Sequence, residues 1–258
     1  MENFKQLALR AAKESGKIII GNLNKIKEID YKGKFNLVTN VDQQSQDKIV
    51  EIIHHSLPDH GILAEEKGGL KKKDSPYKWL IDPLDGTTNY AHGYPCFCVS
   101  IALEKEGNVI MAVIYNPVLN ELFFAEKGKG AFLNGGKICA SQTKKVSRSL
   151  LATGFPYNRG ENLNYHLKQF KNFMEHCHGI RRDGSAALNL SYLAMGRFDG
   201  FWEVNLSPWD TAAGSLIVKE AGGKITTFSG KPFSHYAKET LASNGLIHQE
   251  MLKILHTP

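Results

Sequence analysis

The sequence predicts an α+β fold on the strength of two observations. Residues 96–126 hold three runs rich in β-branched and aromatic residues, separated by turn residues, which is typical of an antiparallel meander. After Gly135, short apolar runs alternate with helical patterns, which indicates a second, layered half. The chain has 258 residues, of which 42% are hydrophobic, so it can build one large domain or two closely packed halves.

The N-terminal half begins with two predicted helices. Apolar residues recur at helical spacing over residues 4–12, which predicts an amphipathic helix. A second helix follows Asp42 and ends at Pro58, because proline cannot continue a helix. The run GILAEE at 61–66 predicts a short strand that ends in two glutamates.

The centre of the chain is predicted to be mostly strand. A glycine- and lysine-rich segment at 67–78 is expected to form a mobile loop. Trp79, Leu80 and Ile81 then form a buried strand, and the meander follows. In the second half we expect strands at 149–155, 179–182, 198–204, 224–228 and 240–243, and helices at 162–176, 185–195, 207–223 and 246–255.

Charge and targeting signals restrict the class of protein. The formal net charge of +6 and the pI near 9.0 suit an anionic partner, but the charge is too diffuse to predict nucleic-acid binding. The longest apolar run before residue 30 is three isoleucines, too short for a signal peptide, and no run approaches the ~20 apolar residues of a membrane span. We therefore expect a cytoplasmic protein that is not membrane-bound.

The cysteines do not suggest a metal or disulfide framework. Cys96, Cys98, Cys139 and Cys177 form no C-x-x-C pair, and the first two have strand spacing. Reduced thiols in the core of a cytoplasmic protein are the favoured interpretation over zinc ligands.

The stretch WLIDPLDGTTNY at 79–90 carries the strongest chemical signal. Pro83 and Gly86 favour a turn, and a turn alone would explain this composition. However, Asp82 and Asp85 follow a buried strand that holds them rigidly, and two like charges held close together repel unless a cation lies between them. Carboxylate oxygens are hard ligands, so the expected cation is Mg²⁺.

The residues that follow suggest what this ion would serve. If a helix starts after Gly86, its first backbone N–H groups are free, and the glycine lets an anion approach them closely. A phosphate site beside a metal indicates hydrolysis of a phosphate ester by a metal-activated water.

Two further acidic stretches can join this site. Glu65 and Glu66 end a predicted strand, where paired glutamates are usually solvated. Asp210 follows Pro208 and Trp209 at the start of an alanine-rich helix, where an aspartate usually only caps the helix. Both stretches follow apolar or aromatic residues at the end of an element, which favours a role in the metal site.

These motifs resemble those of a known family. DPLDGTTNY, AEE and PWDTAAGSLIVKEAGG are similar to the three signature regions of the inositol monophosphatase family of lithium-sensitive, Mg²⁺-dependent phosphatases, and LVTNVD and RRDGSAALNLSYLAMGRFDGFWE also match. The likeness extends from about residue 4 to residue 255. It implies a layered α/β/α/β/α sandwich of the sugar-phosphatase type, with halves at 1–140 and 141–258 forming one catalytic unit, and a homodimer.

The resemblance also implies a metal centre. Glu65, Asp82 and the backbone carbonyl of Leu84 would hold a first Mg²⁺, and Asp82, Asp85 and Asp210 a second. Glu65 would contact a third, weaker ion. Asn36 stands where many members of the family carry an acidic residue, which would diminish that third site.

The remaining roles concern water and substrate. Thr87, backed by Asp42, would polarise the attacking water together with Glu65, and the N–H groups of Gly86 and Thr87 would contact the phosphate. No histidine nucleophile is needed, so His92 is expected to pack or lie on the surface. The ring hydroxyls of the substrate would be bound by Ala186, Glu203, Asp85 and Asp210.

We expect inositol monophosphate to be the substrate, because TTNY resembles the corresponding residues of the inositol branch of the family. A broader sugar phosphatase that accepts fructose 1,6-bisphosphate is the main alternative, followed by a nucleotidase and a histidinol-phosphate phosphatase. An accessory role in transcription complexes also stays open, with Arg181, Arg182 and Lys71–Lys73 as the surface; we expect instead that Arg182 braces the dimer or the site and that the lysines are solvated.

Overall fold

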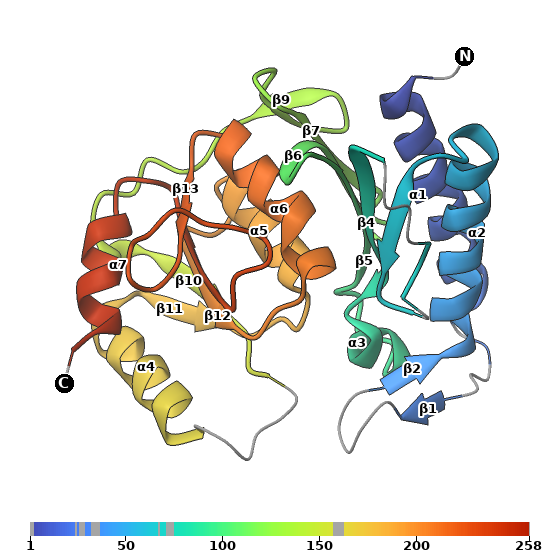
Figure 1. Cartoon of the computed structure of the whole chain (residues 1–258). Helices are drawn as coiled ribbons and strands as arrows, with labels where there is room; N and C mark the ends of the chain where they lie inside the picture. The colour runs from blue at the N-terminus through green and yellow to red at the C-terminus, as the bar shows by residue number, and fades with distance from the viewer. Residues whose placement is uncertain are drawn as a thin grey trace.

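A computed structural model shows the chain as five layers (Figure 1). Two N-terminal helices form one outer layer, followed by a seven-stranded sheet, two central helices, a five-stranded sheet and a second outer pair of helices. This is the α/β/α/β/α sandwich that the family resemblance implied. The structure describes residues 3–23, 25, 29–31, 37–66, 68–70, 75–156 and 163–257.

The seven-stranded sheet contains the predicted meander. Every neighbouring pair in it is antiparallel except the first pair, β3 and β4, which is parallel. Two short strands extend the meander beyond the prediction, because three residues are too few to show a period of two. In spatial order the strands are β3 (Gly61–Ala64), β4 (Tyr77–Asp85), β5 (Cys98–Lys105), β6 (Asn108–Asn116), β7 (Glu121–Glu126), β8 (Ala131–Leu133) and β9 (Gly136–Ile138).

The five-stranded sheet is mixed. Strand β10 pairs in parallel with both of its neighbours, whereas the last two pairs are antiparallel. The order is β11 (Gly179–Arg181), β10 (Leu150–Thr153), β12 (Gly200–Val204), β14 (Glu239–Ser243) and β13 (Lys224–Thr226). A separate ribbon, not predicted from the sequence, pairs β1 (Ile29–Tyr31) with β2 (Leu37–Thr39).

The helices cover both sheets and separate them. Gly214 brings the two central helices close together, because a Cβ there would lie 2.5 Å from Leu190 Cδ1. The outer pair on the seven-stranded sheet is α1 (Phe4–Gly21) and α2 (Asn40–Ser56); the central pair is α5 (Ala186–Ala194) and α6 (Pro208–Glu220); the outer pair on the five-stranded sheet is α4 (Leu163–His176) and α7 (His248–Leu255). The short helices are α3 (Thr87–Ala91) and the 3₁₀ turn η1 (Val146–Arg148).

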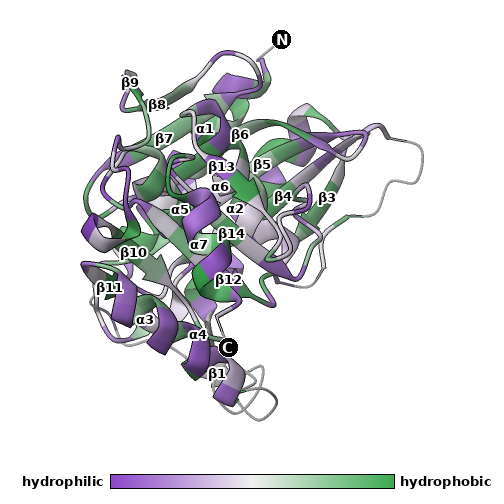
Figure 2. Ribbon diagram, turned by 90° about the vertical axis from the view of Figure 1, so that its left-hand side faces the viewer, coloured by the Kyte–Doolittle hydropathy of each residue, from purple (hydrophilic) through white to green (hydrophobic). Residues whose placement is uncertain are grey.

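The central layer is apolar on all sides because it is buried between two sheets. One core cluster contains Leu80 and Ile114 of the first sheet, Phe201 and Ala242 of the second, and the apolar residues of α5 and α6. Figure 2 shows strands β5, β10 and β12 in hydrophobic green and the outward turns of α4 in hydrophilic purple. The predicted division between residues 140 and 141 falls between the two sheets, but since the halves share this core, the division stays a prediction.

Several predicted details change. α1 continues to Gly21, well past the predicted pattern, and β4 continues through the acidic residues to Asp85. The end of the predicted 67–78 loop belongs to β4, while residues 67 and 71–74 lie outside the described residues. None of the helices in the described ranges has the length and apolarity needed to cross a membrane.

The four cysteines are free thiols, as predicted, but they do not all lie in the core. Cys98 is buried, Cys96 and Cys177 are half-buried, and Cys139 is exposed. Cys139 follows the edge strand β9, where the sheet ends and solvent begins.

Candidate active site

The site begins where β3 and β4 end. Because these strands are parallel, with Ala64 opposite Ile81, their carboxyl ends lie at the same edge of the sheet. The backbone N–H of Glu65 donates to the carbonyl of Ile81 at 3.2 Å, which holds Glu65 beside Asp82. Asp82 itself is only 2% exposed. The paired strands therefore explain how Glu65 and Asp82, which are far apart in the chain, come together.

A bulge in β4 orients its two aspartates. In a regular strand, residues three apart point to opposite faces. Here the pairing register shifts between Asp82 and Asp85, and the backbone N–H of Leu84 donates to Asp82 Oδ1 at 3.0 Å. The extra residue turns both carboxyl groups toward the same space, which is a common use of a bulge next to a functional site.

Asp210 reaches the site from the start of α6. Its Oδ2 accepts the backbone N–H of Ser207 at 2.7 Å in a capping box, so the predicted capping role is present. Asp210 is also hydrogen-bonded to Asp82. The first turn of α6 is held there by Ser100, which lies opposite Asp82 on β5 and whose hydroxyl donates to the Trp209 carbonyl at 3.2 Å.

The carboxyl groups perturb one another strongly. The pKa of Asp82 is raised well above its usual value, first by burial and then by the charges of Glu65, Asp85 and Asp210. Burial is also the main reason that the pKa of Asp210 is raised well above normal, with a further contribution from Asp85. The pKa of Asp85 rises to about 6 through burial, although hydrogen bonds from Ser185 and from backbone N–H groups oppose the rise. The four predicted carboxyl groups therefore lie near enough to one another to interact through their charges.

This donor set fits Mg²⁺ in chemistry and charge. Carboxylate and carbonyl oxygens are its preferred ligands, and a cluster of buried like charges needs a cation or protons to persist. As the side chains stand, no group of three or more histidine, cysteine, aspartate or glutamate residues among those described could hold a metal ion.

A threonine hydroxyl faces the same space. Thr87 Oγ1 lies 2.8 Å from Asp42 Oδ1 and 3.0 Å from the Leu84 carbonyl oxygen. Asp42 is fixed because its other oxygen accepts the backbone N–H and the hydroxyl of Thr39, which caps α2. A hydroxyl carries one proton, so when Thr87 donates to Asp42 the Leu84 carbonyl is left as a free acceptor.

Gly86 makes the sharp entry into α3 possible. Its φ is +95°, and a Cβ there would lie 2.8 Å from the carbonyl oxygen of Cys96, so both the backbone and the space require glycine. The sequence analysis missed Asn89, whose amide donates at 2.7 Å to the carbonyls of Cys96 and Asp183 and so ties α3 to the segment before α5. Its place within GTTNY was the signal available.

The predicted substrate residues lie on the opposite side. Ala186 begins α5 and is 7% exposed, and its backbone N–H is hydrogen-bonded to Asp85. Glu203, near the end of β12, is half-buried; its pKa rises to about 8 through burial and the charges of Asp210 and Asp85, whereas Arg182 lowers it. Glu203 therefore faces the carboxylate cluster. Gly154, missed by the sequence analysis, lies directly against the Glu203 carboxylate.

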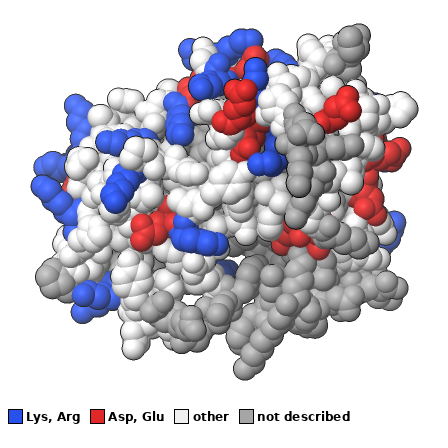
Figure 3. All heavy atoms as spheres, viewed as in Figure 1, with Lys and Arg blue, Asp and Glu red and all other residues white. Residues whose placement is uncertain are grey.

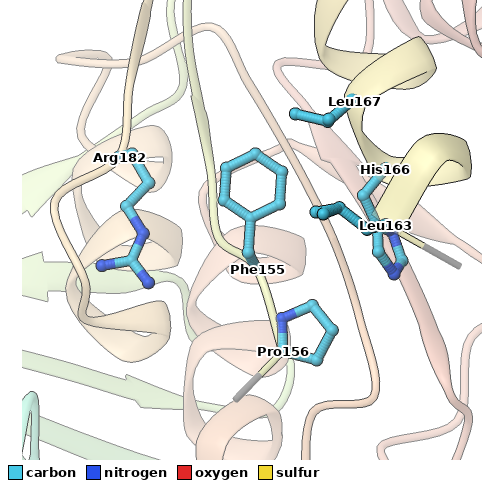
Figure 4. A pocket seen from close by; sticks show the side chains of 6 residues that line it. All are labelled: Phe155, Pro156, Leu163, His166, Leu167 and Arg182. Carbon is cyan, nitrogen blue, oxygen red and sulfur yellow. The ribbon is translucent and has the colours of Figure 1, made fainter. Parts of the chain in front are cut away.

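A cavity of about 290 Å³ lies next to this side of the site (Figure 4). In Figure 4 the Phe155 ring stands between Arg182 and the side chains of α4. Arg182 thus lines a pocket and acts electrostatically on Glu203. The lining residues are Phe155, Pro156, Leu163, His166, Leu167 and Arg182.

The other predicted residues either lie on the surface or fall outside the described residues. His92 is exposed, as expected of a residue with no catalytic role. Asn36 and Lys71–Lys73 lie outside the described residues.

Comparison with known sequences gives one consistent family. The inositol monophosphatase family model matches residues 1–257. The inositol-1-monophosphatase of Synechocystis sp. is 43% identical over 256 residues, which cover 99% of this chain and 89% of that protein. The Nus factor SuhB of Pasteurella multocida is 41% identical over 232 residues, covering 89% and 87% of the two chains.

Solved structures agree with this result. The extragenic suppressor protein suhB of Bartonella henselae superimposes with a TM-score of 0.94 at 38% identity, covering 97% of each chain. An IMPase/NADP phosphatase complexed with Mg²⁺ and phosphate has a TM-score of 0.86 at 28% identity, covering 98% of this chain and 95% of that one. With the fold, the order of the motifs and these relatives in agreement, the chain belongs to the inositol monophosphatase family.

Proposed function

We propose that this protein is a Mg²⁺-dependent phosphomonoesterase that hydrolyses inositol monophosphate to inositol and phosphate. The observation that carries the proposal is the convergence of four carboxylates, from Glu65, Asp82, Asp85 and Asp210, beside the Thr87 hydroxyl. The relative that was solved with Mg²⁺ and phosphate, and the Synechocystis relative named inositol-1-monophosphatase, support the choice of metal and substrate.

In this proposal the metal ligands are those expected from the sequence. Glu65, Asp82 and the Leu84 carbonyl would hold one Mg²⁺; Asp82, Asp85 and Asp210 would hold a second; and Glu65 would contact a third, weaker ion. Bound Mg²⁺ would supply a Lewis acid that lowers the pKa of a water and neutralises charge on the phosphoryl group. The raised pKa values of Asp82 and Asp210 support this assignment, because a divalent cation relieves the repulsion that raises them.

The side chains beside the metal would orient the nucleophile. When the Thr87 hydroxyl donates a hydrogen bond to Asp42, its lone pairs are free to accept a hydrogen bond from the attacking water. Glu65 would accept the second proton of that water. The backbone N–H groups of Gly86 and Thr87 would donate to the phosphate oxygens. Gly86 is the N-cap of α3 and Thr87 is its first residue, so α3 itself offers no acceptor for these N–H groups.

The substrate ring would lie on the side of α5 and β12. The Glu203 carboxylate, together with Asp85, Asp210 and the first residue of α5, Ala186, would contact its hydroxyls. A carboxylate that binds a hydroxyl disfavours a ligand that lacks it, because the buried acceptor is then left unpaired.

A panel of phosphate esters tests the proposal. Phosphate release would be measured with Mg²⁺ on inositol 1-phosphate, fructose 1,6-bisphosphate, adenosine 3′,5′-bisphosphate and histidinol phosphate, each with and without excess chelator. We expect the highest kcat/KM for inositol 1-phosphate and no turnover in chelator. Full turnover in chelator would contradict the metal mechanism, and a higher kcat/KM for fructose 1,6-bisphosphate would favour the broader sugar phosphatase.

A second candidate function is an accessory role in transcription, and the name of the Pasteurella relative favours it. On the face drawn in Figure 3, lysines and arginines are spread out with acidic residues among them, which does not form a single basic surface. An Asp82→Asn protein separates the two roles: loss of phosphatase activity with a retained cellular phenotype would favour the accessory role.

Three further properties belong to the same proposal. We expect a homodimer, which light scattering would detect as twice the chain mass of 28.7 kDa. We expect the protein in the cytoplasm, where cell fractionation would find it. Li⁺ and Ca²⁺ are expected to inhibit turnover by competing within the metal centre, which titration of either ion into the assay would measure.

A further inference from the structure

We propose that Gly154 is a positioning residue that fixes the Glu203 carboxylate in the site and so sets the preference for hydroxylated substrates. The proposal deepens the proposed function, because it rests on Glu203 contacting substrate hydroxyls.

The first argument is steric. The three atoms nearest to a Cβ built on Gly154 are the two carboxylate oxygens and Cδ of Glu203, and all of them would overlap it. Gly154 is not among the glycines with positive φ, so its backbone conformation can be adopted by any residue. The Glu203 carboxylate, and not the backbone conformation, therefore leaves no room for a side chain at position 154.

The second argument concerns what can move. β10 and β12 pair in parallel, with Thr153 opposite Trp202, and the Thr153 hydroxyl donates to the Trp202 carbonyl at 2.7 Å. Glu203 itself lies opposite Thr240 on the other side of β12. The backbone is thus held on both sides of the contact, so a new methyl group at residue 154 displaces the flexible end of Glu203 rather than a strand.

The third argument is that little else holds the carboxylate. Within the ranges that the structure describes, the Glu203 side chain accepts no hydrogen bond, and Asp210 and Asp85 repel it while Arg182 attracts it. Its acceptor oxygens are thus available to substrate hydroxyls. The space over Gly154 is the feature that lets the carboxylate stay beside the carboxylate cluster.

The consequence is a substrate-dependent effect. Gly154→Ala should move the acceptor away from the ring hydroxyls without touching Thr87 or the proposed metal ligands. An ester whose leaving group has no aliphatic hydroxyls does not use Glu203, so its hydrolysis should not change.

The experiment is a double-mutant cycle with two substrates. Steady-state kcat and KM would be measured at saturating Mg²⁺ on inositol 1-phosphate and p-nitrophenyl phosphate for wild type, Gly154→Ala, Glu203→Ala and the double variant. We expect Gly154→Ala to lower kcat/KM at least tenfold on inositol 1-phosphate, mainly through KM, and to stay within twofold of wild type on p-nitrophenyl phosphate. In the Glu203→Ala background the second substitution should have no further effect.

Gly179→Ala is the matched control. Gly179 lies on β11 of the same sheet and has no positive φ, and its added Cβ would meet nothing closer than 3.5 Å. We expect wild-type kinetics with both substrates. A crystal structure of Gly154→Ala gives an independent readout, in which the Glu203 carboxylate should move and the β10 and β12 backbones should not.

The results that overturn the proposal are distinct. An equal loss on both substrates, a further loss in the Glu203→Ala background, or an unmoved carboxylate in the crystal structure would show a merely structural role. If the wild type hydrolyses inositol 1-phosphate and Gly154→Ala does so equally well, this inference alone is refuted. A wild-type protein that releases phosphate from neither ester would refute the proposed function and this inference together.

Discussion

At the scale of single residues, the site depends on side chains that serve two purposes. Asp42 caps α2 through Thr39 and also receives the Thr87 hydroxyl at 2.8 Å. Asp210 caps α6 and also faces Asp82. The usual structural explanation of such residues, a helix cap, is therefore correct but incomplete, because a carboxylate has two oxygens and a cap needs only one.

The Thr87 hydroxyl should matter chiefly for turnover. We expect Thr87→Val to lower kcat by roughly 10²–10⁴-fold, the usual range for a positioned proton-transfer group, because it removes the hydroxyl but keeps the volume. Thr87→Ser keeps the hydroxyl and should retain most activity. Steady-state kinetics on inositol 1-phosphate measure both, and a valine variant within twofold of wild type would exclude the assigned role.

Glu65→Gln and Asp210→Asn should each lower turnover by orders of magnitude while the fold stays intact. Asn at 210 can still accept the Ser207 N–H, so the cap persists while one charge leaves the cluster. In chelator, Asp210→Asn should melt no lower than wild type, since like-charge repulsion falls. Kinetics and thermal unfolding test this prediction, and near-wild-type turnover in either variant would contradict it.

At the scale of elements, the junction between β4 and α3 arranges the site. The sequence predicts the buried strand and the turn residues but not the bulge, because a register shift depends on the pairing of β4 with β5. It also gives no sign that Asn89 would reach the Asp183 carbonyl, since the two residues belong to different halves of the chain. Local pattern determines where an element starts, whereas hydrogen bonds between elements determine its register.

Gly86→Ala should disrupt this junction. The left-handed φ costs an alanine roughly 1–2 kcal/mol, and the clash with the Cys96 carbonyl adds a cost of about 1–3 kcal/mol. Gly93→Ala is the control, because its φ is +70° but its added Cβ would meet nothing within 4 Å. In urea unfolding, Gly86→Ala should lose clearly more stability than Gly93→Ala; equal losses would mean that only the backbone conformation matters.

At the scale of the whole molecule, the site joins elements of all the layers except the outer layer formed by α4 and α7. Glu65 and the two aspartates of β4 come from the first sheet, Asp42 from α2, Asp210 and Ala186 from the central helices, and Glu203 from the second sheet. The shared core around α5 and α6 sets the distance between the two sheets. A buried charge cluster at this junction opposes folding unless a cation or protons neutralise it.

The destabilising effect of this buried charge cluster should make the stability of the metal-free protein depend on pH. The pKa of Glu203 is raised to about 8 in the folded state, so its contribution to stability is present below its ordinary pKa of 4.5 and is lost as the pH rises through about 8. We therefore expect the metal-free protein to have a lower Tm at pH 8.5 than at pH 7.0, at roughly 2–4 °C for each kcal/mol lost. His248, whose pKa is lowered to about 4, is neutral across this window and does not oppose the trend.

Calorimetry in chelator at the two pH values measures the effect. Glu203→Gln is the control and should flatten the dependence, because its amide does not titrate. Added Mg²⁺ should raise the Tm at both pH values. At a hundredfold excess over its Kd, the bound ion adds about 2.7 kcal/mol to the free energy of unfolding. A Tm that rises from pH 7.0 to 8.5 in chelator would contradict the prediction.

The sequence by itself determined the α+β class, most of the described helices and strands, and the acidic residues worth considering, because hydrophobic period and turn composition act over a few residues. The family resemblance supplied the five layers and the roles. Only the tertiary structure decided that Glu65, which follows β3, and side chains of β4, α2, α6 and β12 meet, and that Gly154 leaves room for Glu203. The physical reason is that convergence and free space depend on contacts between residues far apart in the chain, which no local pattern encodes.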